Sequence, residues 1–123
     1  MMRSPLMLAL GAATVLGATP ASAGTFRRPA TPHERAVIVA QAHRSVPKDC
    51  VQRVYMSRLD RRFAMFTVRA DFTECDSEDG GVIVVGYKHG RWRWIVDASQ
   101  GTSCFVPGIP ARVLESLVLC YTR

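Results

Sequence analysis

The sequence lacks the motifs on which the common enzyme classes depend. It contains no G-x-S-x-G nucleophile motif, no HExxH zinc motif, no phosphate-binding loop and no glycine-rich dinucleotide motif. It also has no C-x-x-C pair, the short spacing that a zinc site favours. These absences predict a protein without a metal or cofactor and leave no obvious residue for nucleophilic catalysis.

Long hydrophobic runs are scarce as well, and the one near the amino terminus has the pattern of an export signal. Arg3 is the only charge before the apolar run 6–16, and Ala21-Ser22-Ala23 supplies the small residues of a cleavage site. We expect a signal peptide over 1–23, a mature chain from Gly24 and a secreted protein. An uncleaved anchor is the alternative. No later run reaches the length of a membrane helix, so no membrane span is expected after cleavage.

Acidic residues are few outside one segment. The chain has 16 Lys and Arg against 10 Asp and Glu, a formal charge of +6. Half of the acids fall within nine residues, 71–79, which leaves the remaining chain strongly basic. Such a basic surface could bind polyanions, namely cell-wall teichoic acid, nucleic acid or an anionic lipid surface.

The mature chain predicts one small α+β domain. A short lead, 24–30, is expected to be flexible, and the domain covers 31–123. Thr31-Pro32-His33-Glu34 has the form of a capping box, which predicts a helix from 31 to about 44. Pro47 follows as the stop signal.

After this helix the apolar pattern changes from helical to alternating. It predicts one hairpin with arms 51–58 and 62–72, and a second hairpin with arms 82–87 and 91–98 around His89-Gly90. A last helix follows Pro110, with an apolar stripe made by Val113, Leu114, Leu117 and Val118. We predict a four-stranded antiparallel meander with the helices packed in a two-layer α+β fold. The alternative is a curved sheet wrapped around the first helix.

The four cysteines, Cys50, Cys75, Cys104 and Cys120, form an even set in a chain predicted to enter an oxidising compartment. Three pairings are open to four cysteines. The predicted first hairpin brings Cys50 close to Cys75, and Cys104 and Cys120 flank the last helix. The architecture therefore favours Cys50–Cys75 and Cys104–Cys120.

Several of these segments resemble a group of uncharacterised small secreted proteins of high-GC Gram-positive bacteria. The matching features are Cys50 before a strand with Val51, Val54, Ser57 and Asp60, the stretch Gly90-Arg91-Trp92-Arg93-Trp94, and Cys104 ahead of Val-Pro-Gly-Ile-Pro and a helix ending at Leu119-Cys120. The resemblance spans most of residues 32–120. It implies no particular activity.

The candidate binding face lies on the second arm of the first hairpin. Phe63 and Met65 alternate to the side opposite Ala64, Phe66 and Val68, so this side of the strand is partly apolar. If bare, it forms a contact surface with the neighbouring arginines Arg58, Arg62 and Arg69. We expect a monomeric, non-catalytic binding module whose partner is a protein or an anionic surface of the cell envelope. Nucleic acid is disfavoured because Trp92 and Trp94 alternate away from Arg91 and Arg93.

Two other functions are consistent with the residues present. A small ribonuclease-like hydrolase would use His33 or His43 with Glu34, and it requires the histidine and the carboxylate within hydrogen-bond reach in a cleft. Extracellular calcium binding would use the acidic segment formed by Asp71, Glu74, Asp76, Glu78 and Asp79, although this segment lacks the EF-hand pattern.

Overall fold

The computed structural model describes residues 26–70, 75 and 81–122. Its elements run in the order β1 (Arg27–Pro29), α2 (Pro32–Ala42), the short 3-10 turn η2 (Lys48–Cys50), β2 (Val51–Ser57), β3 (Phe63–Val68), β4 (Gly81–Lys88), β5 (Arg91–Asp97) and α3 (Ala111–Leu117). The strands form one sheet in sequence order, β1 to β5, with every neighbouring pair antiparallel. The predicted α+β class and the antiparallel meander are confirmed.

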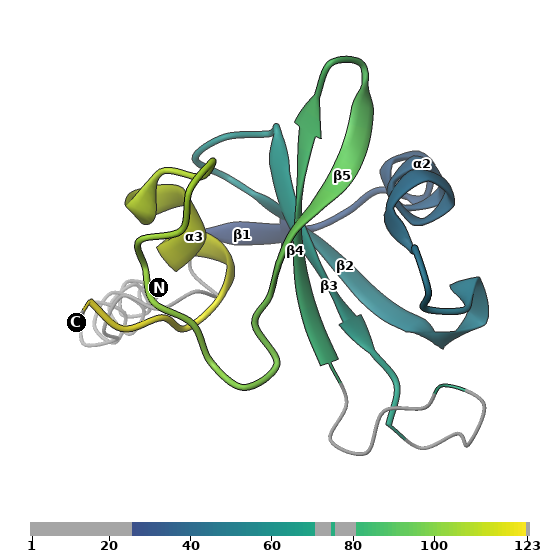
Figure 1. The fold of residues 1–123 in the computed structure, drawn as a ribbon. Helices are drawn as coiled ribbons and strands as arrows, with labels where there is room; N and C mark the ends of the chain where they lie inside the picture. Colours follow the sequence, from purple (N-terminus) through teal and green to yellow (C-terminus); the bar gives the residue numbers. More distant parts are fainter. Residues whose placement is uncertain (1–25, 71–74, 76–80, 123) are drawn as a thin grey trace, which may run out of the picture.

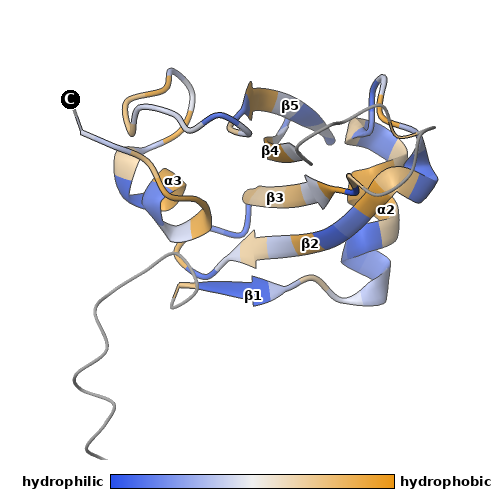
Figure 2. Cartoon of the chain, turned by 90° about the horizontal axis from the view of Figure 1, so that it is seen from below, coloured by the Kyte–Doolittle hydropathy of each residue, from blue (hydrophilic) through white to orange (hydrophobic). Residues whose placement is uncertain are grey.

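The sheet has five strands, and the prediction of four was incomplete. The additional strand, β1, lies within the segment predicted to be a flexible lead and pairs Arg27 with Ser57 at the edge of β2. Figure 2 shows why its residues carried no strand signal, since β1 is among the most hydrophilic strands of the sheet. A non-local contact holds it in place: Arg27 lies over the Tyr55 ring and donates a hydrogen bond to the Leu117 carbonyl.

The two helices lie on opposite faces of the sheet, so the fold has three layers rather than the predicted two (Figure 1). The alternation along β3 accounts for this arrangement. Ala64 and Phe66 belong to the core beneath α2, whereas Met65 belongs to the core beneath α3. Both faces of this central strand are therefore buried.

The first core lies between α2 and the sheet. It combines Ile38, Val39 and Ala42 of α2 with Val54, Met56, Ala64, Phe66, Ile83, Val85 and Trp92 of the strands. The helix begins as predicted, because Thr31 accepts a hydrogen bond from the Glu34 amide while the Glu34 carboxylate accepts one from the Thr31 amide. It ends at Ala42, before Arg44 adopts a positive φ of 50°.

The second core lies between α3 and the other face. Val113, Leu114, Leu117 and Val118 are all buried there, as the apolar stripe predicted. They pack with Met65, Val84, Ala98 and Ile109. Phe63 and Ile95 border this core and fill the space beside Gly86, where an added Cβ would lie 2.7 Å from Ile95 Cδ1.

The hairpins and the disulfides also follow the sequence. His89 and Gly90 both have positive φ, 54° and 83°, as a tight two-residue hairpin turn requires. Cys50 is bonded to Cys75 and Cys104 to Cys120, with Cα–Cα distances of 5.4 and 5.0 Å, so the favoured pairing is confirmed. Within the described residues, no helix has the length and apolar character needed to cross a membrane.

Candidate functional site

The face proposed from the sequence as a binding surface is covered. Met65 is only 3% exposed and belongs to the core under α3, and Phe63 is partly buried against the same core. The expectation of a bare apolar strand face is therefore wrong. Its physical reason is that α3 packs on the side of the sheet opposite α2, which the strand pattern alone did not specify.

The arginines assigned to that face do not form one surface. Arg58 and Arg62 flank the turn between β2 and β3, whereas Arg69 follows the far end of β3, where its amide binds the Cys50 carbonyl. The six residues of β3 separate the two groups by about 20 Å at the usual rise of an extended strand. Only the pair at the turn can contribute to a single site.

A groove of about 540 Å³ lies between the first half of α2 and the end of the sheet that carries the two hairpin turns. Ile38, Met56 and Trp92 are buried and form its apolar floor. The full lining is His33, Glu34, Val37, Ile38, Met56, Asp60, Arg61, Arg62, Tyr87 and Trp92. The groove thus combines apolar surface with titratable groups from three separate segments.

Both carboxylates of the groove are already paired. The two Glu34 oxygens accept hydrogen bonds of 2.8 Å from the Arg28 guanidinium, and this bonding lowers the pKa of Glu34 to about 2. Arg62 likewise donates to both oxygens of Asp60 and holds the pKa of that carboxyl below its usual range. Each acid is ionised at neutral pH, and its charge is offset by a neighbouring arginine.

The cationic and polar groups on the rim are less engaged. Within the described part of the chain, the side chains of Arg61 and His33 form no hydrogen bond or ion pair, and both are exposed. Tyr87 is 45% exposed and meets Trp92 edge to face, with ring centroids 5.6 Å apart. A ligand in the groove would therefore lie beside the free hydrogen-bond donors of Arg61 and His33. It would also contact the aromatic rings of Tyr87 and Trp92.

The histidines do not form the arrangement that the hydrolase hypothesis requires. His33 and Glu34 both line the groove, but the Glu34 carboxylate is bound by Arg28 and by the Thr31 amide. His43 Nδ1 lies 2.9 Å from the Val46 carbonyl, and His89 occupies the second hairpin turn. No histidine–carboxylate pair occurs among the residues that the structure describes.

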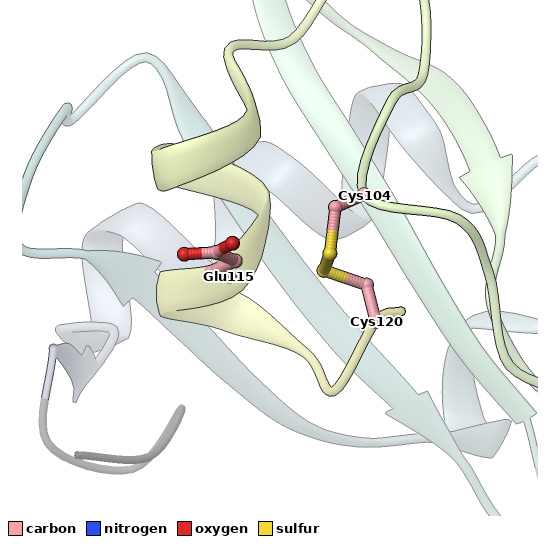
Figure 3. A group of neighbouring side chains, drawn as sticks. All are labelled: Cys104, Glu115 and Cys120. Carbon is pink, nitrogen blue, oxygen red and sulfur yellow. A yellow bond between two sulfur atoms is a disulfide. The ribbon is translucent and has the colours of Figure 1, made fainter. Parts of the chain in front are cut away.

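One group of possible metal ligands is explained by a disulfide. Cys104, Glu115 and Cys120 place their ligand atoms within 4.8 Å of one another. Figure 3 shows the two sulfur atoms bonded to each other beside Glu115, so neither is a thiolate able to bind a metal. The acidic segment considered for calcium lies outside the described residues apart from Cys75, which is bonded to Cys50.

No family model, curated protein or solved structure matches the chain. The sequence pattern indicated His33 and Glu34 as candidates but did not predict that Arg61, Met56 and Tyr87 are their neighbours. Tyr87 is an aromatic residue in a strand otherwise rich in buried aliphatic residues, and its exposure is known only from the structure.

Proposed function

We propose that the protein is an exported, non-catalytic binding module and that the groove is its ligand site. The chemistry of the groove suits a small amphiphilic anion, in which an acidic group is attached to an apolar or aromatic body. Export is supported by the signal pattern of residues 1–23 and is consistent with the two disulfides. The resemblance to small secreted proteins is consistent with export and implies neither an activity nor a ligand.

The proposal is supported mainly by one observation. The groove has free hydrogen-bond donors next to apolar surface, and its own carboxylates are neutralised by arginines. Arg61 and His33 are available to an acidic group, while Met56 and Trp92 offer apolar surface. Because Arg28 and Arg62 bind the two carboxylates, these acids repel an incoming anion only weakly. Ligand sites commonly have this composition, an apolar surface with a few placed polar groups.

Binding is favoured over hydrolysis because, among the described lining residues, no free carboxylate is placed to work with His33 as an acid–base pair. A general base works best when its pKa lies near the operating pH. Glu34 has a pKa of about 2, and both of its oxygens are occupied by Arg28. In this structure it is a structural carboxylate that caps α2 and anchors Arg28.

A fluorescent amphiphilic anion tests the proposal directly. We expect 1-anilinonaphthalene-8-sulfonate to bind the mature protein at one site and to receive excitation energy from Trp92. N-phenyl-1-naphthylamine, which has the same rings without the sulfonate, should bind more weakly. Arg61→Gln should lower the affinity for the sulfonate by about tenfold, the usual effect of losing one charge-assisted hydrogen bond.

Arg112→Gln is the matched control, because Arg112 is an exposed arginine on α3 and does not line the groove. It should leave the affinity unchanged. Equal binding of the two probes, or an equal loss in Arg61→Gln and Arg112→Gln, would contradict the groove as an anion site. Circular dichroism melting curves check that each variant is folded.

A further inference from the structure

We propose that one end of the sheet docks on an anionic lipid surface. This end, named here the hairpin end, carries the β2–β3 turn, the β4–β5 turn and the start of β1. It consists of Phe26, Arg58, Leu59, Arg61, Arg62, Tyr87, Lys88 and Arg91. Figure 1 shows the β2–β3 and β4–β5 turns in the upper part of the molecule.

Three large apolar side chains are exposed at the hairpin end. Phe26, Leu59 and Tyr87 have 40%, 44% and 45% of their surface exposed. Backbone hydrogen bonds link the segments that carry them: the Arg58 amide, next to Leu59, binds the Phe26 carbonyl at 2.7 Å, and the Tyr87 amide binds the Arg62 carbonyl at 2.7 Å. The apolar groups are thus spread along one end of the sheet.

The same end is strongly cationic. Its cations, Arg58, Arg61, Arg62, Lys88 and Arg91, are all exposed. The carboxylate within the β2–β3 turn, Asp60, is bound by Arg62. Two other described acids, Asp49 before β2 and Asp97 at the end of β5, lie at the opposite end of the strands.

The combination of apolar and cationic groups favours a lipid surface over a charged polymer. The free energy falls when exposed Phe and Leu side chains enter the interface between headgroups and acyl chains, while Lys and Arg remain at the level of the anionic headgroups. A purely ionic polymer would leave Phe26 and Leu59 in water. An anionic lipid surface is also a surface that an exported protein meets.

Vesicle flotation tests this assignment with the mature protein. We expect the protein to float with phosphatidylcholine vesicles that contain about 30% phosphatidylglycerol and to remain unbound with phosphatidylcholine alone, because the cations need anionic headgroups. Binding should fall as salt rises, since exposed charges are screened. The double variant Lys88→Gln/Arg91→Gln should weaken binding on the order of tenfold, and Leu59→Ser should weaken it several-fold.

Matched controls lie elsewhere on the surface. Lys48→Gln/Arg112→Gln removes the same charge, and Leu119→Ser removes an apolar side chain that is 81% exposed near the Cys104–Cys120 disulfide. Neither control should change flotation. Equal binding to both vesicle types, equal loss in the controls, or unchanged flotation of Leu59→Ser would overturn the proposal.

The vesicle test is independent of the groove test. Lys88, Arg91 and Leu59 do not line the groove, so their variants should retain the affinity for 1-anilinonaphthalene-8-sulfonate. Arg61, Arg62 and Tyr87 belong to both the groove and the hairpin end. Loss of vesicle binding with intact probe binding therefore supports docking through the residues of the hairpin end that lie outside the groove. Loss of both in the same variant would contradict it.

Discussion

Glu34 has two structural roles at the residue scale. It closes the capping box of α2 through the Thr31 amide, and it binds Arg28, which lies in β1. The first role is readable from the sequence because the Thr-x-x-Glu spacing is local. The second depends on the position of β1 beside the helix start, so no local pattern predicted it.

We predict that Glu34 makes stability depend on pH in the acid range. Its pKa is lowered from 4.5 to about 2 in the folded protein, mainly by the hydrogen bonds from Arg28. A group with a lowered folded pKa contributes stability above its unfolded pKa and loses that contribution as pH falls through the folded value. The contribution of Glu34 should therefore be complete at pH 6 and decline from about pH 5 to pH 2.

Urea unfolding of the wild type and Glu34→Gln across this range measures the effect. The substituted amide side chain would still accept the cap hydrogen bond but would carry no charge, so the variant should be less stable at neutral pH. The difference in free energy of unfolding should shrink as pH falls towards 2. Arg28→Gln should give the same pH trend, and a difference that stays constant with pH would contradict this role.

The two central hairpins and the helix start were predictable at the scale of elements, because their signals are local. The alternation of β4 and β5 and the His89-Gly90 turn defined one hairpin, and the capping box defined the start of α2. Strand ends were less accurate: β3 ends at Val68 rather than at Phe72. The β2–β3 register also shifts between Val51 and Arg53, which a regular alternation does not anticipate.

The contact between α2 and β5 protects an edge of the sheet. Among the strands that the structure describes, β5 has a neighbour only on its β4 side, and exposed edges can pair with other chains. Gln41 of α2 accepts a hydrogen bond of 2.8 Å from the Trp92 amide, and the Trp94 indole donates to the Ala42 carbonyl. The end of α2 therefore accepts hydrogen bonds from the Trp92 amide and the Trp94 indole of β5, so these donors are not available to another chain.

We predict that Gln41→Ala destabilises the protein by about 1 kcal/mol, because the Trp92 amide loses its acceptor. The variant should also associate more readily at high concentration, since part of the β5 edge becomes available for pairing. Gln41→Glu retains an acceptor at this position and should be closer to the wild type. Urea unfolding and light scattering measure the two effects, and an Ala variant that matches the wild type in both would contradict them.

The whole molecule is a sheet covered on both faces, with one disulfide near each helix. Cys50, in η2 after α2, is bonded to Cys75, and Cys104 and Cys120 join the segments before and after α3. A small domain has limited apolar surface to bury, so such bonds add substantially to its stability.

We predict that the double variant Cys104→Ala/Cys120→Ala loses about 3 kcal/mol, the usual effect of opening a loop of this length. The residues are 16 apart in the sequence. Because α3 covers Met65, local opening of this helix should expose the second core before the first. Hydrogen exchange should show the larger increase around Met65 and Val84, and a uniform increase in both cores would contradict this order.

The sequence by itself determined the α+β class, the capped start of α2, the tight turn at His89-Gly90 and the cysteine pairing. These features depend on local spacing or on neighbours joined by a short turn. Only the tertiary structure decided that β1 joins the sheet, that α3 covers Met65, and that Arg61 and Tyr87 lie near His33. Each of those outcomes depends on contacts between residues that are distant in the chain. In a strand that is buried on both faces, the alternation of side chains does not predict which helix covers which face.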